Sequence, residues 1–170
     1  MRLPFPSVAG LTFLLAAPFS AAGQATQNPS PMVEHTRSHL RLKEEKPSGR
    51  REPLEIGTLF LPANLRLQGK VPLLVHFHGS TWLPEAAARD GKTAVLTVQL
   101  GSGSSAYARP FADPKRFAEL LKRAEEKAGV QFDPVTLSAW SAGYGAVREI
   151  LKVPEYYQRV RGVLEILRSE

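Results

Sequence analysis

Residues 136–151 read TLSAWSAGYGAVREIL, and this stretch decides how the rest of the sequence is interpreted. It begins inside PVTLSAWS, an apolar run typical of a buried strand, and continues into AGYGAVREILK, which has the pattern of a helix. Ser141 falls at the junction. A sharp strand-to-helix turn can hold a serine exposed, as a nucleophile must be. The alternative is an ordinary tight turn with a capping serine.

The residues around Ser141 fit the crowded backbone of such a turn. The usual pattern is G-x-S-x-G, and here it reads Ala139-Trp140-Ser141-Ala142-Gly143. Alanine in place of the first glycine is a mild departure, because that position mainly needs a small residue. A serine two residues before a glycine occurs by chance in many chains, so the predicted strand and helix on either side carry the argument.

Strands and helices alternate on both sides of this stretch. Buried strands are predicted at 71–79 (VPLLVHFHG) and 93–101 (TAVLTVQLG), and a further strand at 160–167 (VRGVLEIL). A helix is predicted at 113–129, with a short helix or turn at 81–92 and a flexible loop, GSGSSAYARPFA, at 101–112. One face of the 113–129 helix carries its apolar residues: Phe117, Leu120, Leu121, Ala124 and Ala128.

The N-terminal part differs from this alternation. Residues 35–42 (HTRSHLRL) alternate weakly and 53–62 (PLEIGTLFLP) have a strand pattern, with a turn-rich loop at 43–52 between them. We therefore predict an α/β fold with a mostly parallel sheet that begins with an antiparallel N-terminal strand pair.

Three short segments follow parallel strands in this prediction, and ligands of such sheets bind beyond the carboxyl ends of the strands. The segments are HGS at 78–80, GSGSS at 101–105 and SAG at 141–143. We expect them to lie close together. Phosphate binding by GSGSS is the weaker interpretation, because neither a G-K-[ST] motif nor a helix opening directly at the glycines follows.

The HGS segment can complete a site around Ser141. A backbone N–H from Gly79 or Ser80, together with that of Ala142, would form an oxyanion hole. His78 is expected to shape the turn and His76 to be a hydrogen-bonded core histidine. A metal site from these two histidines would need further ligands, and none is obviously placed. We therefore predict neither a metal nor a cofactor.

In their order and spacing, HFHGS, LGSGSS and AWSAG resemble the front half of the α/β-hydrolase fold, over residues 36–167. More narrowly, the chain is similar to exported bacterial α/β-hydrolases. The resemblance implies a serine hydrolase acting on small-molecule esters or related acyl compounds. It implies Ser141 as the nucleophile, with Ala142, Gly79 and Ser80 as oxyanion donors. Tyr107, Trp82 and Trp140 are candidates for the walls of a substrate pocket, although core packing explains Trp140 equally well.

The resemblance does not supply a complete triad. In that family the acid and then the histidine follow the nucleophile, whereas the four histidines here are His35, His39, His76 and His78. The sequence is therefore interpreted as a hydrolase complete only in a longer form, with its last strand an open edge. The alternative is a non-catalytic remnant or binding module for a small molecule or partner.

The ends and the composition limit the other possibilities. Residues 1–23 have the charged start, apolar stretch and small-residue exit of a signal peptide, which predicts export to the periplasm or medium. Its apolar stretch is shorter than the ~20 residues of a membrane span, so an uncleaved tether is the less favoured alternative. Residues 24–34 are expected to be a flexible lead-in, and 35–170 a partial hydrolase domain. The net charge of +6 is scattered among acids, so no nucleic-acid partner is predicted. The sequence makes no prediction of oligomeric state.

Overall fold

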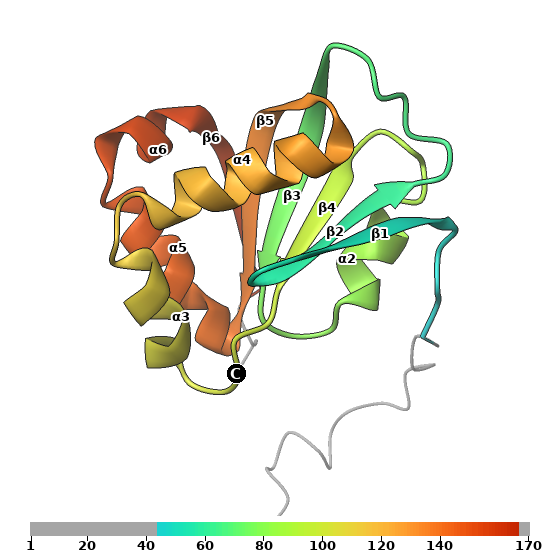
Figure 1. Ribbon diagram of the computed structural model, residues 1–170. Helices are drawn as coiled ribbons and strands as arrows, with labels where there is room; N and C mark the ends of the chain where they lie inside the picture. Colours follow the sequence, from blue (N-terminus) through green and yellow to red (C-terminus); the bar gives the residue numbers. More distant parts are fainter. Residues whose placement is uncertain (1–43, 167–170) are drawn as a thin grey trace, which may run out of the picture. The chain divides into compact units, whose positions relative to one another are not determined.

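The computed structural model describes residues 44–166, in which six strands form one mixed sheet with helices on both faces (Figure 1). The strands are β1 (Gly49–Leu54), β2 (Gly57–Pro62), β3 (Lys70–Phe77), β4 (Ala94–Val98), β5 (Gln131–Trp140) and β6 (Val160–Ile166). The helices are α2 (Trp82–Ala87), α3 (Ser104–Phe111), α4 (Arg116–Ala128), α5 (Tyr144–Leu151) and α6 (Pro154–Arg159), with a 3-10 turn η1 (Ser141–Gly143). The predicted signal peptide (1–23), the lead-in (24–34) and the expected strand at 35–42 lie outside the described residues.

The sheet runs in the order β1-β2-β4-β3-β5-β6. Strand β2 pairs antiparallel with both β1 and β4, and β4, β3, β5 and β6 are parallel to one another. An α/β fold with a mostly parallel sheet is thus confirmed. Because parallel strands point the same way, the carboxyl ends of β3, β4 and β5 all lie on the same side of the sheet, at the bottom of Figure 1. The predicted ligand-binding segments begin at these strand ends.

The prediction for the first strands was wrong in detail. Residues 53–62 are not one strand, because the chain turns at Glu55 and Ile56 and pairs Leu54 with Gly57. Strand β1 instead includes part of the 43–52 segment, predicted as a loop. It lies at the edge of the sheet, where polar and charged side chains are tolerated, so Arg50 and Glu52 mask the strand pattern.

Residues 104–111 form helix α3, although this segment was predicted as a loop. Its glycines and serines precede the helix or open it, and Gly103 just before it has φ +96°. Tyr107 and Phe111, four residues apart on one face, are buried, and the Phe111 ring meets that of Phe77 edge-on at 5.3 Å. This packing outweighs the cost of Pro110 in the last turn.

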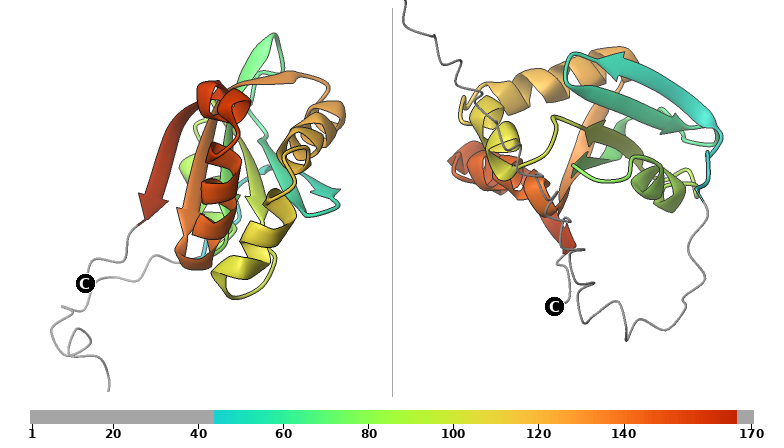
Figure 2. Two further views of the ribbon diagram at one scale, coloured as in Figure 1. Left: turned by 90° about the vertical axis from the view of Figure 1, so that its left-hand side faces the viewer. Right: turned by 90° about the horizontal axis from the view of Figure 1, so that it is seen from below.

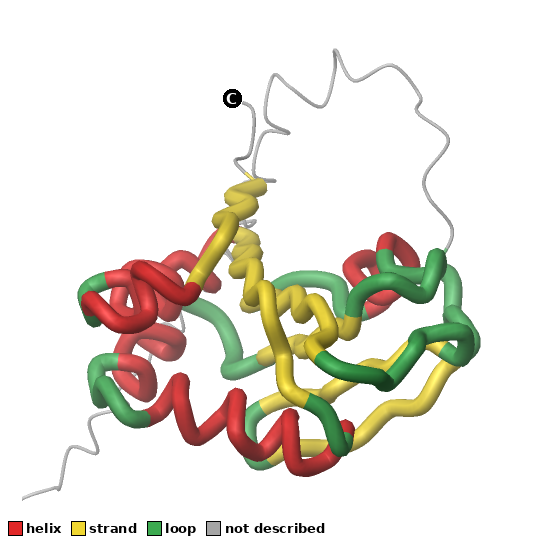
Figure 3. Tube along the Cα trace, turned by 90° about the horizontal axis from the view of Figure 1, so that it is seen from above, coloured by secondary structure: helices red, strands yellow, loops and turns green. Residues whose placement is uncertain are grey.

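The two faces of the sheet are covered by different helices (Figures 1 and 2). Helices α3, α4 and α5 pack on one face over the main core, and Ala88 just after α2 packs with Phe60 and Val95 on the other. The predicted helix at 113–129 is confirmed as α4, which ends at Gly129 in the left-handed region and buries all five predicted apolar residues. Figure 3 shows α4 alongside the β1–β2 hairpin. No helix within residues 44–166 combines the length and hydropathy of a membrane span.

Candidate active site

Ser141 occupies a strained and exposed turn at the end of β5. Trp140 is the last extended residue, with φ −116° and ψ 134°, and the chain then enters η1 and α5 directly. Ser141 itself has φ +44°, a value that non-glycine residues rarely adopt. Its side chain is exposed to solvent. This is the strand–turn–helix context that a serine nucleophile needs.

Two glycines allow the turn to lie close against its neighbours. A Cβ on Gly143 would lie 2.1 Å from the carbonyl oxygen of Phe77, at the end of β3. A Cβ on Gly145 would lie equally close to the carbonyl oxygen of Ser104, at the start of α3. Ala139, where the motif usually has glycine, is fully buried with its methyl group accommodated. Positions 143 and 145 therefore require glycine, whereas position 139 accepts alanine.

The segment after β3 makes a second turn beside the first. His78 and Gly79 both lie in the left-handed region, with φ +67° and +91°. The N–H of His78 still donates to the carbonyl of Val98, so the turn begins while the chain is bonded to β4. A Cβ on Gly79 would lie 3.2 Å from the Cβ of Trp140. Together with the close approach of Gly143 to Phe77, this distance confirms the predicted proximity of segments 78–80 and 141–143.

Ala142 is the second residue of η1 and is buried. The first N–H groups of a helix have no partner within the helix, so the amide of Ala142 is free of the helical hydrogen bonds. Its position one residue after Ser141 is that of an oxyanion donor in the strand–turn–helix arrangement. Its role in binding an oxyanion stays a prediction.

His76 and His78 have different surroundings. His76 is buried on β3, and its Nδ1 lies 2.9 Å from the hydroxyl of Ser138 on β5, which fits the expected core histidine. Burial lowers the pKa of His76 below its ordinary value, with a smaller contribution from His78, while the backbone of His78 opposes the shift. The ring is therefore favoured in its neutral form.

The ring of His78 is held by Tyr107 on α3. Its Nδ1 lies 2.9 Å from the Tyr107 hydroxyl, and that oxygen also accepts the N–H of Leu100 at 3.1 Å. The Tyr107 hydroxyl makes both hydrogen bonds when it donates its own proton to His78 and accepts the N–H of Leu100. The side chain of Tyr107 is 0% exposed. As a pocket wall it offers no open surface, and what it offers the site is a fixed position for His78.

Gln99, directly after β4, also contacts the turn. Its Nε2 donates a hydrogen bond of 3.0 Å to the carbonyl oxygen of Gly79. The sequence interpretation did not single out Gln99. The signal was available, because a polar residue that follows a buried parallel strand lies at the edge where ligands bind. Trp82, the other predicted wall residue, is half-buried at the start of α2, just after the turn.

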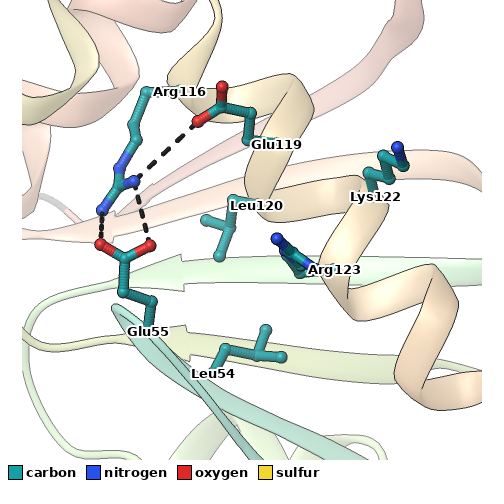
Figure 4. A pocket seen from close by; sticks show the side chains of 7 residues that line it. All are labelled: Leu54, Glu55, Arg116, Glu119, Leu120, Lys122 and Arg123. Atoms are coloured by element: carbon teal, nitrogen blue, oxygen red, sulfur yellow. Dashed lines mark hydrogen bonds and ion pairs between the residues drawn. The ribbon is translucent and has the colours of Figure 1, made fainter.

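A separate cavity of about 380 Å³ lies between the β1–β2 turn and α4 (Figure 4). Figure 4 shows Arg116 between Glu55 and Glu119, and Arg116 donates to both oxygens of Glu55, at 2.8 and 3.2 Å. These hydrogen bonds hold the pKa of Glu55 below its usual range. Its carboxylate is thus paired and poorly suited to proton transfer. No residue that lines this cavity comes from the turns around Ser141: Leu54, Glu55, Arg116, Glu119, Leu120, Lys122 and Arg123.

Neither metal ligands among the described residues nor a similar protein gives the site another identity. Within residues 44–166 no three His, Asp or Glu side chains gather as metal ligands would. Neither a protein-family model nor a curated protein sequence matches the chain. The geometry of the turns is therefore what supports a candidate function.

Proposed function

We propose that this chain carries the nucleophile and oxyanion half of a serine hydrolase site of the α/β-hydrolase type, which acts on small esters or related acyl compounds. The observation that carries the proposal is the exposed, left-handed Ser141 between β5 and α5. Backbone strain of this kind is uncommon away from sites where it serves a purpose. The antiparallel start of the sheet and its parallel remainder fit the same interpretation.

In this mechanism the hydroxyl oxygen of Ser141 attacks the carbonyl carbon of the ester, and a base takes the hydroxyl proton. The carbonyl oxygen becomes an oxyanion, stabilised by the N–H groups of Ala142 and of Gly79 or Ser80. The protonated base then returns its proton to the leaving oxygen, and the tetrahedral intermediate expels the alcohol and leaves an acyl group on Ser141. Hydrolysis of this ester requires a second proton transfer from water.

The base is the component that the described residues do not bring to the serine. No histidine follows Ser141 in the sequence, and within residues 44–166 neither His76 nor His78 forms a hydrogen bond with the Ser141 hydroxyl, since their side-chain bonds go to Ser138 and Tyr107. We therefore expect the 170-residue chain to hydrolyse p-nitrophenyl acetate at a rate close to that of Ser141→Ala.

Imidazole added to the solution can replace the missing base and tests the proposal. We expect imidazole to promote transfer of acetyl from p-nitrophenyl acetate to Ser141, with p-nitrophenolate released. The acetyl group should persist once the imidazole is removed, because deacylation also lacks a positioned base. Peptide mass spectrometry locates it, and Ser141→Ala and the exposed Ser104 are the controls. Acetylation of lysines and other serines without preference for Ser141 would instead favour the non-catalytic binding module.

A further inference from the structure

The turn after β3 is fixed at its carbonyl side by a residue from the neighbouring strand. Gln99 follows β4, and its side-chain amide donates to the carbonyl oxygen of Gly79 at 3.0 Å. Gln99 is itself exposed, so no burial requirement explains why its amide points at this carbonyl. The bond determines the rotation of the peptide that joins Gly79 to Ser80.

A trans peptide is planar, and its C=O and N–H point in opposite directions. The one cis peptide among residues 44–166 is at Asp133–Pro134, so the peptide between Gly79 and Ser80 is trans. When Gln99 draws the carbonyl of Gly79 toward β4, the N–H of Ser80 is turned the other way.

The strand order shows what lies in the direction of the Ser80 N–H. Strand β3 lies between β4 and β5, so a group that points away from β4 at the end of β3 points toward the end of β5. Ser141 begins the turn at that end. The contact of Gly79 with the side chain of Trp140 shows that the two turns adjoin.

We infer that Gln99 is a positioning residue, which holds the Gly79–Ser80 peptide so that the N–H of Ser80 faces Ser141 as the second oxyanion donor. This inference rests on the proposed function and selects Ser80 over Gly79 as the donor. Tyr107 assists from the opposite end of the turn, because it fixes the ring of His78. An oxyanion donor contributes most when it is aimed before the reaction begins, so a residue that aims it affects the rate without touching the substrate.

The orientation can be measured directly by NMR, without any ligand. We expect a nuclear Overhauser effect between the amide proton of Ser80 and the Hβ protons of Ser141. It should disappear in Gln99→Leu, which removes the side-chain donor. The matched control is Gln158→Leu, at an exposed glutamine on α6, which should retain the effect. Absence of the effect from the wild-type chain, or its survival in Gln99→Leu, would overturn the inference.

A second measurement uses phenylboronic acid, which forms a tetrahedral anion when the Ser141 oxygen adds to boron and the hydroxyl proton passes to the buffer. Boron NMR reports the change from trigonal to tetrahedral. We expect binding to weaken about tenfold in Gln99→Leu, less than the hundredfold or more that follows outright removal of a donor. Unchanged affinity in Gln99→Leu, beside binding that Ser141→Ala abolishes, would also overturn the inference.

The two measurements separate the inference from the function on which it rests. If phenylboronic acid fails to bind through Ser141 while the Overhauser effect is present and depends on Gln99, the proposed function fails and the orientation of the turn by Gln99 stands. Urea unfolding of Gln99→Leu and Gln158→Leu checks that neither substitution lowers stability enough to explain a loss of binding.

Discussion

At Gly143, the turn that carries Ser141 touches the end of β3 with no space for a side chain. A methyl group there would meet backbone atoms of Phe77, which cannot move as a flexible side chain can. We expect Gly143→Ala to lower the free energy of unfolding by about 3 kcal/mol, the upper part of the range for overpacking. Urea denaturation measures the loss.

Gly162 on β6 provides the matched control for this substitution. A Cβ there would lie 3.5 Å from Thr136, an ordinary contact, and the position has no unusual φ. Gly162→Ala should therefore change the stability by no more than about 0.5 kcal/mol. Equal losses in the two variants would show that close approach of the turn to β3 is not what requires glycine at position 143.

The second residue-scale prediction concerns His76. Because burial lowers its pKa in the folded protein, the unfolded chain binds more protons than the folded chain between that depressed pKa and about 6.5. The free energy of unfolding should thus fall as the pH drops below about 6.5, and the contribution of neutral His76 should be complete above that pH. Urea unfolding between pH 5.5 and 7.5 measures the slope, and His76→Gln should reduce it.

This pH range separates His76 from the acidic groups. The carboxyls of Glu55, Asp133 and Glu149 have lowered pKa values because basic side chains donate hydrogen bonds to them, so their contributions are lost only at more acidic pH. The readout is the difference in slope between wild type and His76→Gln, since the other histidines are common to both. The same slope in both chains would contradict the prediction.

Single residues were predicted where one local rule sufficed. The turn at Ser141 was predicted because small neighbours, a strand before it and a helix after it coincide in one short stretch. The position of Gln99 directly after a buried strand could have marked it as a candidate, but its partner, a carbonyl twenty residues away, follows only from the fold. Tyr107 was selected as a pocket wall, yet its hydroxyl is engaged by His78 and Leu100. Hydrogen-bond partners of this kind follow from the fold and not from spacing.

At the scale of elements, an ion pair between Arg51 and Glu85 joins β1 to α2. Arg51 donates to Glu85 at 2.5 and 3.1 Å, and its guanidinium lies 4.6 Å above the ring of Phe60. Glu85 is buried, so removing only the arginine leaves an uncompensated carboxylate. We expect Arg51→Met to lower the free energy of unfolding by about 3 kcal/mol.

Two further variants test this explanation. Arg51→Met with Glu85→Leu should recover much of the loss, because no buried charge then remains. Arg116→Met breaks the pair with Glu55 across the cavity of Figure 4, where the carboxylate is exposed, and should have little effect. The measurement is urea denaturation of all three variants. A double variant no more stable than Arg51→Met would mean that lost packing of Arg51 on Phe60 is responsible.

The elements themselves were predictable to different degrees for physical reasons. Strands β3, β4 and β5 lie in the interior of the sheet, and their continuous apolar runs identified them. Strand β1 lies at the edge, and helix α3 depends on packing of Tyr107 and Phe111, so neither had a clear local pattern. Helix α4 combined an apolar face with a glycine end signal, so its end at Gly129 was predicted correctly, although it begins at Arg116, later than expected.

At the scale of the described part of the molecule, the free edge of β6 carries two exposed apolar side chains. Leu164 is 59% exposed and Val163 is 39% exposed on this strand, and β6 has no neighbour on its outer side within residues 44–166. An edge strand with free N–H and C=O groups and exposed apolar side chains tends to pair with another chain. We therefore expect the isolated 170-residue chain to self-associate as its concentration rises. Sedimentation velocity should show an increasing average mass.

Substitution on β6 should suppress this association if the edge is responsible. Leu164→Lys places a charge on the exposed strand, a device by which natural edges avoid pairing, and should keep the chain monomeric to higher concentration. Leu83→Lys is the matched control, because Leu83 on α2 is a leucine 40% exposed away from any free edge. If both substitutions suppress association equally, general hydrophobic contact would replace strand pairing as its cause. If neither does, association arises elsewhere on the chain.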